Sequence, residues 1–378
     1  MSEIKSRYKV CRLGDICKDI FAGGDVPTER YSKTKNDKYN IPIYANAEKD
    51  NGLYGYTDIA RVNEPCITIA ARGTIGFTAI RTEPFLPVVR LIVIIPKKDV
   101  VDLEYLYFAL YNIVPRSDGT SIPQLTIPAA KNLIISFPLD ISIQKALVVK
   151  LKKQLLAIDA MAEKTKRQLQ YTISLAARIN KETIVFEGKK EPISKYCVED
   201  KRIIQPDSDD AQSLKYLGME NIDKNTWVYI ASSDIIEAGS STTYYYDKSH
   251  VLYGKLRPYL KKVFLPEQAG RCSTELIPLL PSDTIEHEYL ALLLTDDDLV
   301  GYIMSESTGA RMPRTDMKKL LAYKVSVPNI EEQRTRLETR KKQMKKSNIL
   351  IEKLHKQQEN IDALRACVFK EAFGSEEI

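Results

Sequence analysis

Residues 141–184 read ISIQKALVVKLKKQLLAIDAMAEKTKRQLQYTISLAARINKETI and contain neither proline nor glycine. Every seventh residue along one face is apolar, and these residues are Val148, Leu155, Ala162, Leu169 and Ala176. This spacing predicts one long amphipathic helix over the whole stretch. Met161 and Leu175 flank the series on one side. Thr165 and Thr172 interrupt the apolar stripe, so the helix is not expected to form a perfect zipper.

A second stretch without proline or glycine, residues 331–372, lies in the other half of the chain. Its apolar residues form two seven-residue series, one with Leu337, Met344 and Ile351, the other with Leu354, Ile361 and Val368. An apolar stripe needs a partner, and the simplest partner for each long helix is the other one. We therefore predict two long antiparallel helices that form a coiled coil. The alternative is that each helix packs only on its own domain.

The chain repeats a set of short landmarks in the same order in both halves. Glu104-Tyr105-Leu106 returns as Glu288-Tyr289-Leu290, Gly119-Thr120 resembles Thr308-Gly309, and Gln144 after Pro138 returns as Gln333 after Pro328. Short β-like runs and a short helical stretch accompany each set. We predict an α+β fold in which two mixed α/β domains form a pseudo-two-fold repeat, separated by the long helices. The predicted domains are residues 1–140, 141–184 (first long helix), 185–330 and 331–374 (second long helix).

The overall charge of the chain is mildly basic. Lys+Arg 56 against Asp+Glu 50 gives a net charge of +6 and a pI of about 8.7, which permits nucleic-acid binding without requiring it. The six cysteines form no C-x-x-C pair and the three histidines lie far apart, so structural zinc and disulfides are not expected. The sequence shows no signal peptide and no apolar run of membrane-spanning length. We expect a cytoplasmic protein without membrane contact.

A search for catalytic motifs finds none. The G-x-x-x-x-G-K-[ST] phosphate loop is absent, as is the Asn/Asp-Pro-Pro-aromatic tetrapeptide with which amino-methylating enzymes hold a flipped adenine. The glycine-rich stretch Phe21–Asp25 lacks a third glycine and Pro27 follows at once, so we interpret it as a turn. We predict that the chain has no active site of its own.

Tyrosines gather with basic and amide residues in segments that we expect to be loops. Groups of the 21 tyrosines lie in residues 44–46, 51–56 and 242–248. Such side chains reach the phosphates and base edges of nucleic acids, although half-buried tyrosines in ordinary loops give the same pattern. The basic run Arg340–Lys346 is either a solvated helix face or a surface for a phosphate backbone or an acidic partner.

Several of these segments resemble the specificity subunit of type I restriction–modification enzymes. In the first half the resemblance rests on Ile69-Ala70-Ala71-Arg72-Gly73-Thr74-Ile75-Gly76, which follows Tyr54-Gly55-Tyr56. In the second half it rests on residues 250–263 (HVLYGKLRPYLKKV) and on Cys272-Ser273-Thr274-Glu275. The likeness covers nearly the whole chain, and the two-fold repeat is itself a trait of the family. The loop Gly309–Pro313 departs from the first half, because it lacks a Thr-Ser pair.

The resemblance implies a non-catalytic subunit whose two target-recognition domains each read one half of a split site in double-stranded DNA. Two adenine methyltransferase (modification) subunits would bind around the helices, which would set the spacing between the half-sites. Restriction endonuclease/translocase subunits would join for cleavage. S-adenosylmethionine, ATP and magnesium are then expected in those partners, and this chain would bind no cofactor. The alternative is a non-catalytic, two-module scaffold that binds proteins of a related defence complex.

Four segments are predicted to contact DNA, and they comprise residues 72–74, 117–124, 255–257 and 307–314. Their glycines let the backbone approach, and their polar side chains can reach base edges. The candidate DNA-binding residues are Arg72, Gly73, Thr74, Ser117, Thr120, Ser121, Gln124, Tyr253, Lys255, Arg257, Lys261, Ser307, Thr308, Arg311 and Arg314. For Arg257 an alternative remains, a structural role in the turn that precedes Pro258. No catalytic or metal-binding residue is predicted.

Overall fold

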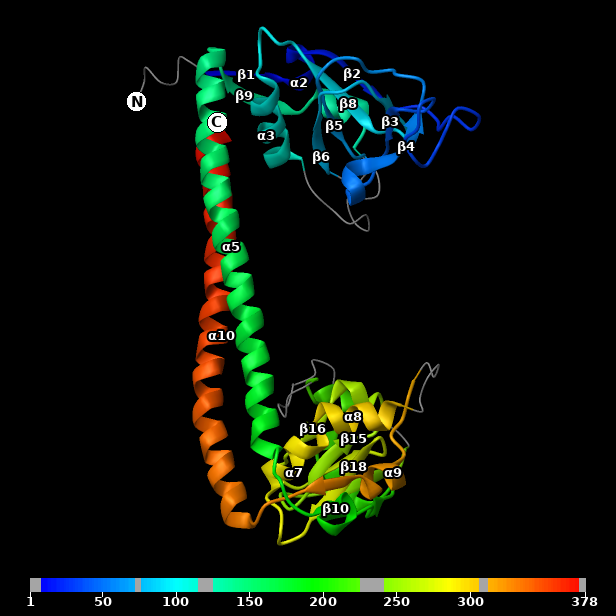
Figure 1. Ribbon diagram of the computed structural model, residues 1–378, viewed down its shortest axis with the longest axis vertical. Coiled ribbons are helices and arrows are strands. Elements are labelled where there is room, and N and C mark those ends of the chain that lie inside the picture. Colours follow the sequence, from blue (N-terminus) through cyan, green and yellow to red (C-terminus); the bar gives the residue numbers. More distant parts are fainter. Residues whose placement is uncertain (1–7, 72–75, 115–124, 225–240, 306–311, 374–378) are drawn as a thin grey trace. The chain divides into compact units, whose positions relative to one another are not determined.

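The protein divides into two compact units in a computed structural model that describes residues 8–71, 76–114, 125–224, 241–305 and 312–373. Unit 1 comprises residues 1–166 and 356–378, and unit 2 comprises residues 167–355. Each unit contains one mixed α/β module and a part of both long helices (Figure 1).

Unit 1 is built on a four-stranded sheet and a smaller three-stranded sheet. The larger sheet has the order β2 (Cys17–Ala22), β8 (Ile92–Pro96), β5 (Cys66–Ile69) and β6 (Thr78–Arg81), and the smaller has the order β4 (Leu53–Thr57), β3 (Ile41–Tyr44) and β7 (Leu86–Pro87). A separate ribbon pairs β1 (Tyr8–Arg12) with β9 (Ile134–Pro138). The short helices are α2 (Leu13–Ile16), η1 (Lys49–Gly52), α3 (Leu103–Ile113) and α4 (Ile127–Lys131).

The core of unit 1 forms around strands that are buried on both faces. Every residue of β5 and β8 is buried, as their uninterrupted runs of apolar and β-branched residues favour. Helix α3 adds Tyr105 and Leu106, both fully buried, to the same core. Asp102 caps the start of α3, because its carboxylate accepts hydrogen bonds from the N–H groups of Glu104 and Tyr105 at 3.0 Å.

Unit 2 repeats this plan with two four-stranded sheets. One has the order β11 (Cys197–Glu199), β18 (Leu276–Pro281), β15 (Val251–Gly254) and β16 (Val263–Phe264), and the other has the order β12 (Ile203–Ile204), β14 (Thr243–Tyr246), β17 (Gly270–Ser273) and β13 (Tyr216–Leu217). A ribbon again pairs the flanking strands, β10 (Lys190–Pro192) and β19 (Lys324–Ser326). The short helices are η2 (Ile193–Lys195), α6 (Asp209–Ser213), η3 (Met219–Asn221), η4 (Pro258–Leu260), α7 (His287–Leu294), α8 (Asp297–Met304) and α9 (Met317–Ala322).

Two fully buried glutamines occupy the same position in the two units. The Gln144 Oε1 atom accepts a hydrogen bond from the N–H of Asp102 at 2.7 Å, and Nε2 donates to the carbonyls of Val100 and Pro138 at 3.2 and 2.7 Å. The Gln333 side chain makes the same three bonds, with the N–H of Glu286 at 2.9 Å and the carbonyls of Thr284 and Pro328 at 2.9 and 2.8 Å. The predicted pseudo-two-fold repeat is therefore confirmed.

Substitution of Gln144 by leucine should destabilise unit 1. The variant leaves one N–H and two carbonyl groups without their partner, and each buried group left unsatisfied costs about 1–3 kcal/mol. We expect the free energy of unfolding to fall by about 3 kcal/mol or more, measured by urea denaturation. The exposed Gln170 on the same helix provides the control, since Gln170→Leu should change the stability by less than about 0.5 kcal/mol. Equal effects of the two substitutions would contradict the anchoring role of Gln144.

The long helices α5 (Ile141–Ile184) and α10 (Ile330–Phe373) are continuous and pack on one another, as predicted. In unit 1, Leu151 and Ile158 of α5 share a buried cluster with Ile361 and Val368 of α10. Ion pairs join Lys150 to Glu371 at 2.6 Å and Asp159 to Arg365. The partners follow opposite orders along the two helices, so the helices are antiparallel.

In unit 2 the end of α5 is bound by arginines of α10. The Arg340 Nε atom donates to Asn180 Oδ1 at 2.8 Å, and the Arg336 Nη1 atom donates to the carbonyl of Val185 at 2.8 Å, just beyond the end of α5. Burial lowers the pKa of Arg340. Through its bond to Val185, Arg336 satisfies a carbonyl beyond the last helical turn and places a positive charge at the negative end of the helix dipole.

The buried face of α5 differs in one respect from the expectation. Thr165 and Thr172, expected to interrupt the stripe, are 1% and 3% exposed, whereas Met161 and Leu175 are 41% and 39% exposed. Residues 151, 158, 165, 172 and 179 are buried at steps of seven, and the half-buried residues 155, 162, 169 and 176 lie between them, which gives the alternating steps of four and three of a heptad seam. The two threonines occupy this seam, in the same seven-residue series as Ile158, and the two larger apolar residues fall outside it.

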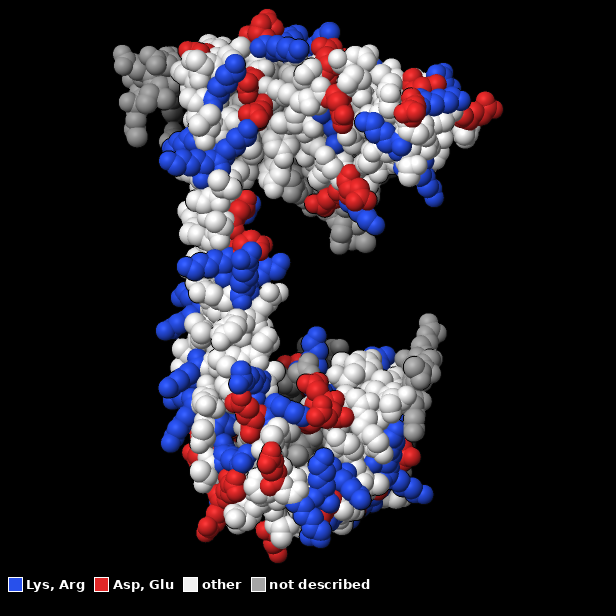
Figure 2. All heavy atoms as spheres, viewed as in Figure 1, with Lys and Arg blue, Asp and Glu red and all other residues white. Residues whose placement is uncertain are grey.

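Basic side chains gather along the long helices (Figure 2). In the run 340–346 the side chain of Arg340 faces α5, whereas Lys341, Lys342, Lys345 and Lys346 are exposed. Both interpretations of the run require such exposed lysines, and Arg340 alone is taken up by packing within the chain. None of the helices within the described residues is long and apolar enough to cross a membrane.

Candidate nucleic-acid interface

In unit 2 the candidate residues that the structure describes lie where the central strand β15 ends. Gly254, the last residue of β15, pairs with Leu276, the first residue of β18. The β15–β16 loop (residues 255–262) therefore starts beside the β17–β18 turn (residues 274–275). The segment that precedes α9 reaches the same edge of the sheet, as its hydrogen bonds to the loop show.

Backbone hydrogen bonds join the β15–β16 loop to this segment. The N–H of Arg257 donates to the carbonyl of Pro313 at 2.8 Å, and the N–H of Thr315 donates to the carbonyl of Lys255 at 2.8 Å. Between them, Leu256 and Arg314 form an antiparallel bridge. Three of the sequence-predicted residues, Lys255, Arg257 and Arg314, are thus brought together.

The charge at this edge is positive. The Glu275 carboxylate accepts a hydrogen bond from the Arg314 Nε atom at 3.2 Å and lies 4.0 Å from the Lys255 Nζ atom. The side chain of Arg257 is exposed, and no ion pair involves it within the described part of the chain. One carboxylate thus faces two cations while a third points to solvent, an arrangement that attracts phosphate.

Arg257 combines the two roles that the sequence left open. Its backbone has φ 52° and ψ 63°, in the left-handed region that few non-glycine residues adopt. Its N–H donates to the carbonyl of Pro313, and the next residue, Pro258, is buried. The backbone therefore holds the turn, while the exposed side chain remains available to a ligand.

Tyr253 and Lys261 are less available than the sequence suggests. Tyr253 is 2% exposed, its hydroxyl lies 2.9 Å from Thr315 Oγ1, and burial raises its pKa to about 12. It therefore lies beneath the loop, where it supports Thr315. The Lys261 Nζ atom donates to Asp297 Oδ1 at 2.6 Å. The Lys261 side chain is only 19% exposed, although the ion pair with the 84% exposed Asp297 is itself worth little.

Unit 1 has the equivalent elements at the end of its central strand. β5 ends at Ile69, which pairs with Ile92 at the start of β8. The N–H of Ala70 donates to the carbonyl of Phe77 at 2.9 Å, and the N–H of Gly76 donates to the carbonyl of Ala70 at 3.0 Å. These bonds close the base of the loop that contains the candidates Arg72, Gly73 and Thr74, which themselves lie outside the described residues.

The remaining candidates belong to one equivalent pair of segments. Residues 115–124, between α3 and α4, hold one group, and residues 306–311, between α8 and α9, hold the other. Ser117, Thr120, Ser121, Gln124, Ser307, Thr308 and Arg311 lie outside the described residues and stay predictions. Their equivalent places in the two modules agree with the predicted repeat.

Sequence reasoning missed a further element at the same edge of unit 1. Between β7 and β8, Val89 and Arg90 both have left-handed backbone, with φ 53° and 61°. This conformation costs about 1–2 kcal/mol for each non-glycine residue. Both side chains are exposed. No turn signal marks these two residues in the sequence, because such turns usually contain Asn-Gly. The nearby Asn46, by contrast, belongs to one of the tyrosine and amide groups noted above.

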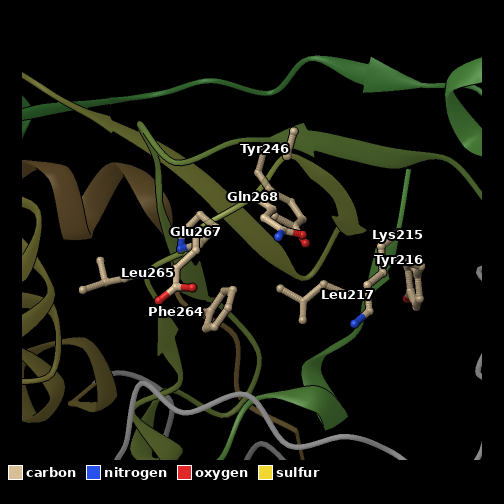
Figure 3. A pocket seen from close by; sticks show the side chains of 10 residues that line it. Lys215, Tyr216, Leu217, Tyr246, Phe264, Leu265, Glu267 and Gln268 are labelled. Atoms are coloured by element: carbon tan, nitrogen blue, oxygen red, sulfur yellow. The ribbon is translucent and has the colours of Figure 1, made fainter. Parts of the chain in front are cut away.

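The described residues contain no group of three or more His, Cys, Asp or Glu side chains that could hold a metal ion. A pocket of about 380 Å³ in unit 2 is lined by Tyr216, Leu217, Tyr246 and Phe264 among others (Figure 3). Tyr246 pairs with Gly270, at the end of the sheet away from Ser273 and the β15–β16 loop. The pocket is therefore separate from the candidate interface.

The chain matches known proteins along most of its length. The family model described as "Type I restriction modification DNA specificity domain" matches residues 5–171 and again residues 189–360. Two Mycoplasma pneumoniae proteins named as type I specificity subunits are similar. S.MpnORF89P is 37% identical over 134 residues (35% of this chain, 39% of that protein), and S.MpnORF507P is 36% identical over 131 residues (35% and 36%). Each match thus spans less than two fifths of the relative's length.

Solved structures share the fold. One, described as "Structural basis underlying complex assembly and conformational transition of the type I R-M system", has a TM-score of 0.69 at 15% identity and covers 97% of both chains. The HsdS subunit from Thermoanaerobacter tengcongensis has a TM-score of 0.55 at 16% identity, over 98% of this chain and 97% of that one. At such low identity the likeness shows a common architecture.

Proposed function

Since the chain belongs to the type I restriction–modification DNA specificity family, we propose that it is the non-catalytic subunit that selects the DNA sequence. Each α/β module would read one half of a bipartite site in double-stranded DNA. The observation that carries this proposal is the edge of unit 2 where Lys255, Arg257 and Arg314 meet. Arginine can pair with two acceptors of guanine in the major groove, and lysine with phosphate.

The partners follow from the same proposal. Two adenine methyltransferase subunits would dock on α5 and α10, and restriction endonuclease/translocase subunits would join them for cleavage. S-adenosylmethionine, ATP and magnesium would be bound by those partners and not by this chain. The assembly would work in the cytoplasm, where the DNA and the cofactors are found.

A substitution of Arg257 tests the proposed DNA reading in unit 2. Arg257→Gly removes the side chain and keeps the left-handed backbone accessible. We expect the affinity of the complex with its methyltransferase subunits for the specific duplex to fall by about 5- to 150-fold, equivalent to 1–3 kcal/mol. Affinity is measured by fluorescence anisotropy at fixed salt, because phosphate contacts depend on salt.

Two further variants make the result specific. Arg257→Lys keeps the charge but loses the two-pronged geometry, so it should restore non-specific binding and not the preference for the site. Lys195, which is exposed and lies on η2, provides the control substitution Lys195→Ala. Unchanged affinity and unchanged site preference in folded Arg257→Gly would remove this residue from the interface.

A further inference from the structure

The turn between β7 and β8 is held in a strained form by its surroundings. The N–H of Leu91 donates to the carbonyl of Val88 at 3.1 Å, and the two central residues, Val89 and Arg90, are both left-handed. This is the geometry of a type I′ turn, which glycine and asparagine favour. A β-branched residue in such a turn persists only when neighbouring groups fix it, and such positions cluster at functional sites.

The glycine-rich stretch of the sequence supplies one of these fixing groups. The N–H of Val89 donates to the carbonyl of Gly24 at 2.8 Å, and the N–H of Gly23 donates to the carbonyl of Leu91 at 2.8 Å. A Cβ atom on Gly23 would lie 2.6 Å from the backbone of Pro87, so only glycine allows this approach. Residues 21–25 do not form the expected turn, because Phe21 and Ala22 end β2 and Gly24 forms a parallel bridge with Val88. This extended segment serves as a strap for the β7–β8 turn.

Asn46 ties the β7–β8 turn to the candidate loop of unit 1. Its Oδ1 atom accepts a hydrogen bond from the N–H of Ala71 at 3.0 Å, and its Nδ2 atom donates to the carbonyl of Val89 at 2.5 Å. Ala71 directly precedes the predicted reading residues. One side chain thus connects three segments that meet at one edge of the sheet.

The equivalent turn of unit 2 touches the residues already proposed to read DNA. This is the β17–β18 turn, in which the carbonyl of Glu275 accepts a hydrogen bond from the N–H of Lys255 at 2.9 Å and the carboxylate binds Arg314. In unit 1 the turn before β8 carries Arg90 in place of a carboxylate. Arg90 is exposed, and no ion pair involves it within the residues that the structure describes.

We propose that Arg90 is a base-reading residue of unit 1 and that Asn46 is the residue that positions it. The proposal rests on the proposed function and extends it to an element outside the predicted loops. A rigid turn suits base reading because it fixes the direction of the guanidinium, which can then pair with two acceptors of guanine. A phosphate contact would not need this rigidity.

The test compares Arg90→Asn with Lys98→Asn in the full chain assembled with its methyltransferase subunits. Asparagine tolerates left-handed backbone, so the turn can form. Lys98 is exposed and follows the opposite end of β8, which makes it a matched control. Binding is measured on the cognate duplex and on duplexes altered in one half-site or the other.

We expect Arg90→Asn to weaken binding to the cognate duplex roughly tenfold or more and to abolish discrimination at one or two base pairs of a single half-site. Lys98→Asn should change neither quantity. Arg90→Lys should restore affinity without discrimination. Equal weakening on all duplexes, with a smaller salt dependence, would instead make Arg90 a phosphate contact and overturn the reading role.

The positioning role of Asn46 has its own readout. Asn46→Asp keeps the acceptor for Ala71 and loses the donor to Val89, so it should reproduce the half-site defect of Arg90→Asn. A purely structural role would lower the melting temperature without a change of half-site preference, and that result would overturn the assignment.

The outcomes separate this inference from the proposed function. If Arg90→Asn binds and discriminates like the unchanged protein while Arg257→Gly does not, the inference fails and the proposed function stands. If the unchanged complex itself shows no preference among the duplexes, the proposed function fails.

Discussion

Replacement of residues 1–140 by the first domain of a relative with a different target should change one half of the methylated DNA motif and leave the other half unchanged. The physical reason is that each unit has its own core and its own edge of loops at the end of a central strand. Reading by one unit then needs no group of the other. The motif is obtained by methylome sequencing of cells that carry the chimaera and its methyltransferase partner.

The structure identifies what the incoming domain must preserve. Phe373 of α10 packs edge-on against Tyr105 at 5.2 Å, and Phe369 stacks on Tyr111 at 5.4 Å. A donor domain without matching aromatic residues would leave these rings exposed. The reciprocal replacement of residues 185–330 is the control and should change only the other half of the motif. A change in both halves after one replacement would contradict independent reading.

A seven-residue insertion into both long helices should widen the gap between the two half-sites. Helix α5 connects the last strand of one module directly to the first strand of the next, so its length limits how far apart the half-sites can lie. Seven residues add roughly 10.5 Å at a rise of 1.5 Å per residue. This length equals about three base pairs at 3.4 Å each if the helices run along the duplex.

The insertion points follow from the pairing of the helices in unit 1. Because Asp159 pairs with Arg365, residues inserted between Leu155 and Ala162 should face residues inserted between Gln358 and Arg365. A seven-residue step keeps the buried seam in phase and leaves a rotation of only about 20°. An insertion of two residues into α5 alone should disrupt the seam and abolish assembly. An active seven-residue variant that methylates the original motif with its original gap would refute the spacing role.

Sequence periodicity was enough to predict the long helices, and paired landmarks were enough to predict the repeat. Gln144 and Gln333 are visible in the sequence because each follows a proline at the start of a long helix. The exact seam was less accessible, because a single apolar series does not show which flank faces the partner. Met161 and Leu175 are therefore exposed, while Thr165 and Thr172 are buried.

The sequence was enough to mark the loops of the candidate interface, but not the residues that hold other parts of it in place. Glycines and basic residues marked the β15–β16 loop and the segment before α9. Asn46, by contrast, acts through hydrogen bonds to residues 25 and 43 positions away, which no local pattern reveals. Likewise, Val and Arg have little propensity for such a turn. The left-handed conformation of Val89 and Arg90 is imposed by the strap at Gly23 and Gly24, which is distant in sequence.

The discontinuity of unit 1 has a consequence for how the protein is made. Unit 2 is formed by one continuous stretch, residues 167–355, whereas unit 1 also needs residues 356–373, which bring Phe369 and Phe373 to its aromatic cluster. Domains generally fold as they leave the ribosome, the N-terminal one first. Here the order of completion is reversed, because unit 2 has all its residues while unit 1 still lacks residues 356–373, the C-terminal part of α10. Until then the buried face of α5 in unit 1 and the rings of Tyr105 and Tyr111 in α3 lack their partners from α10.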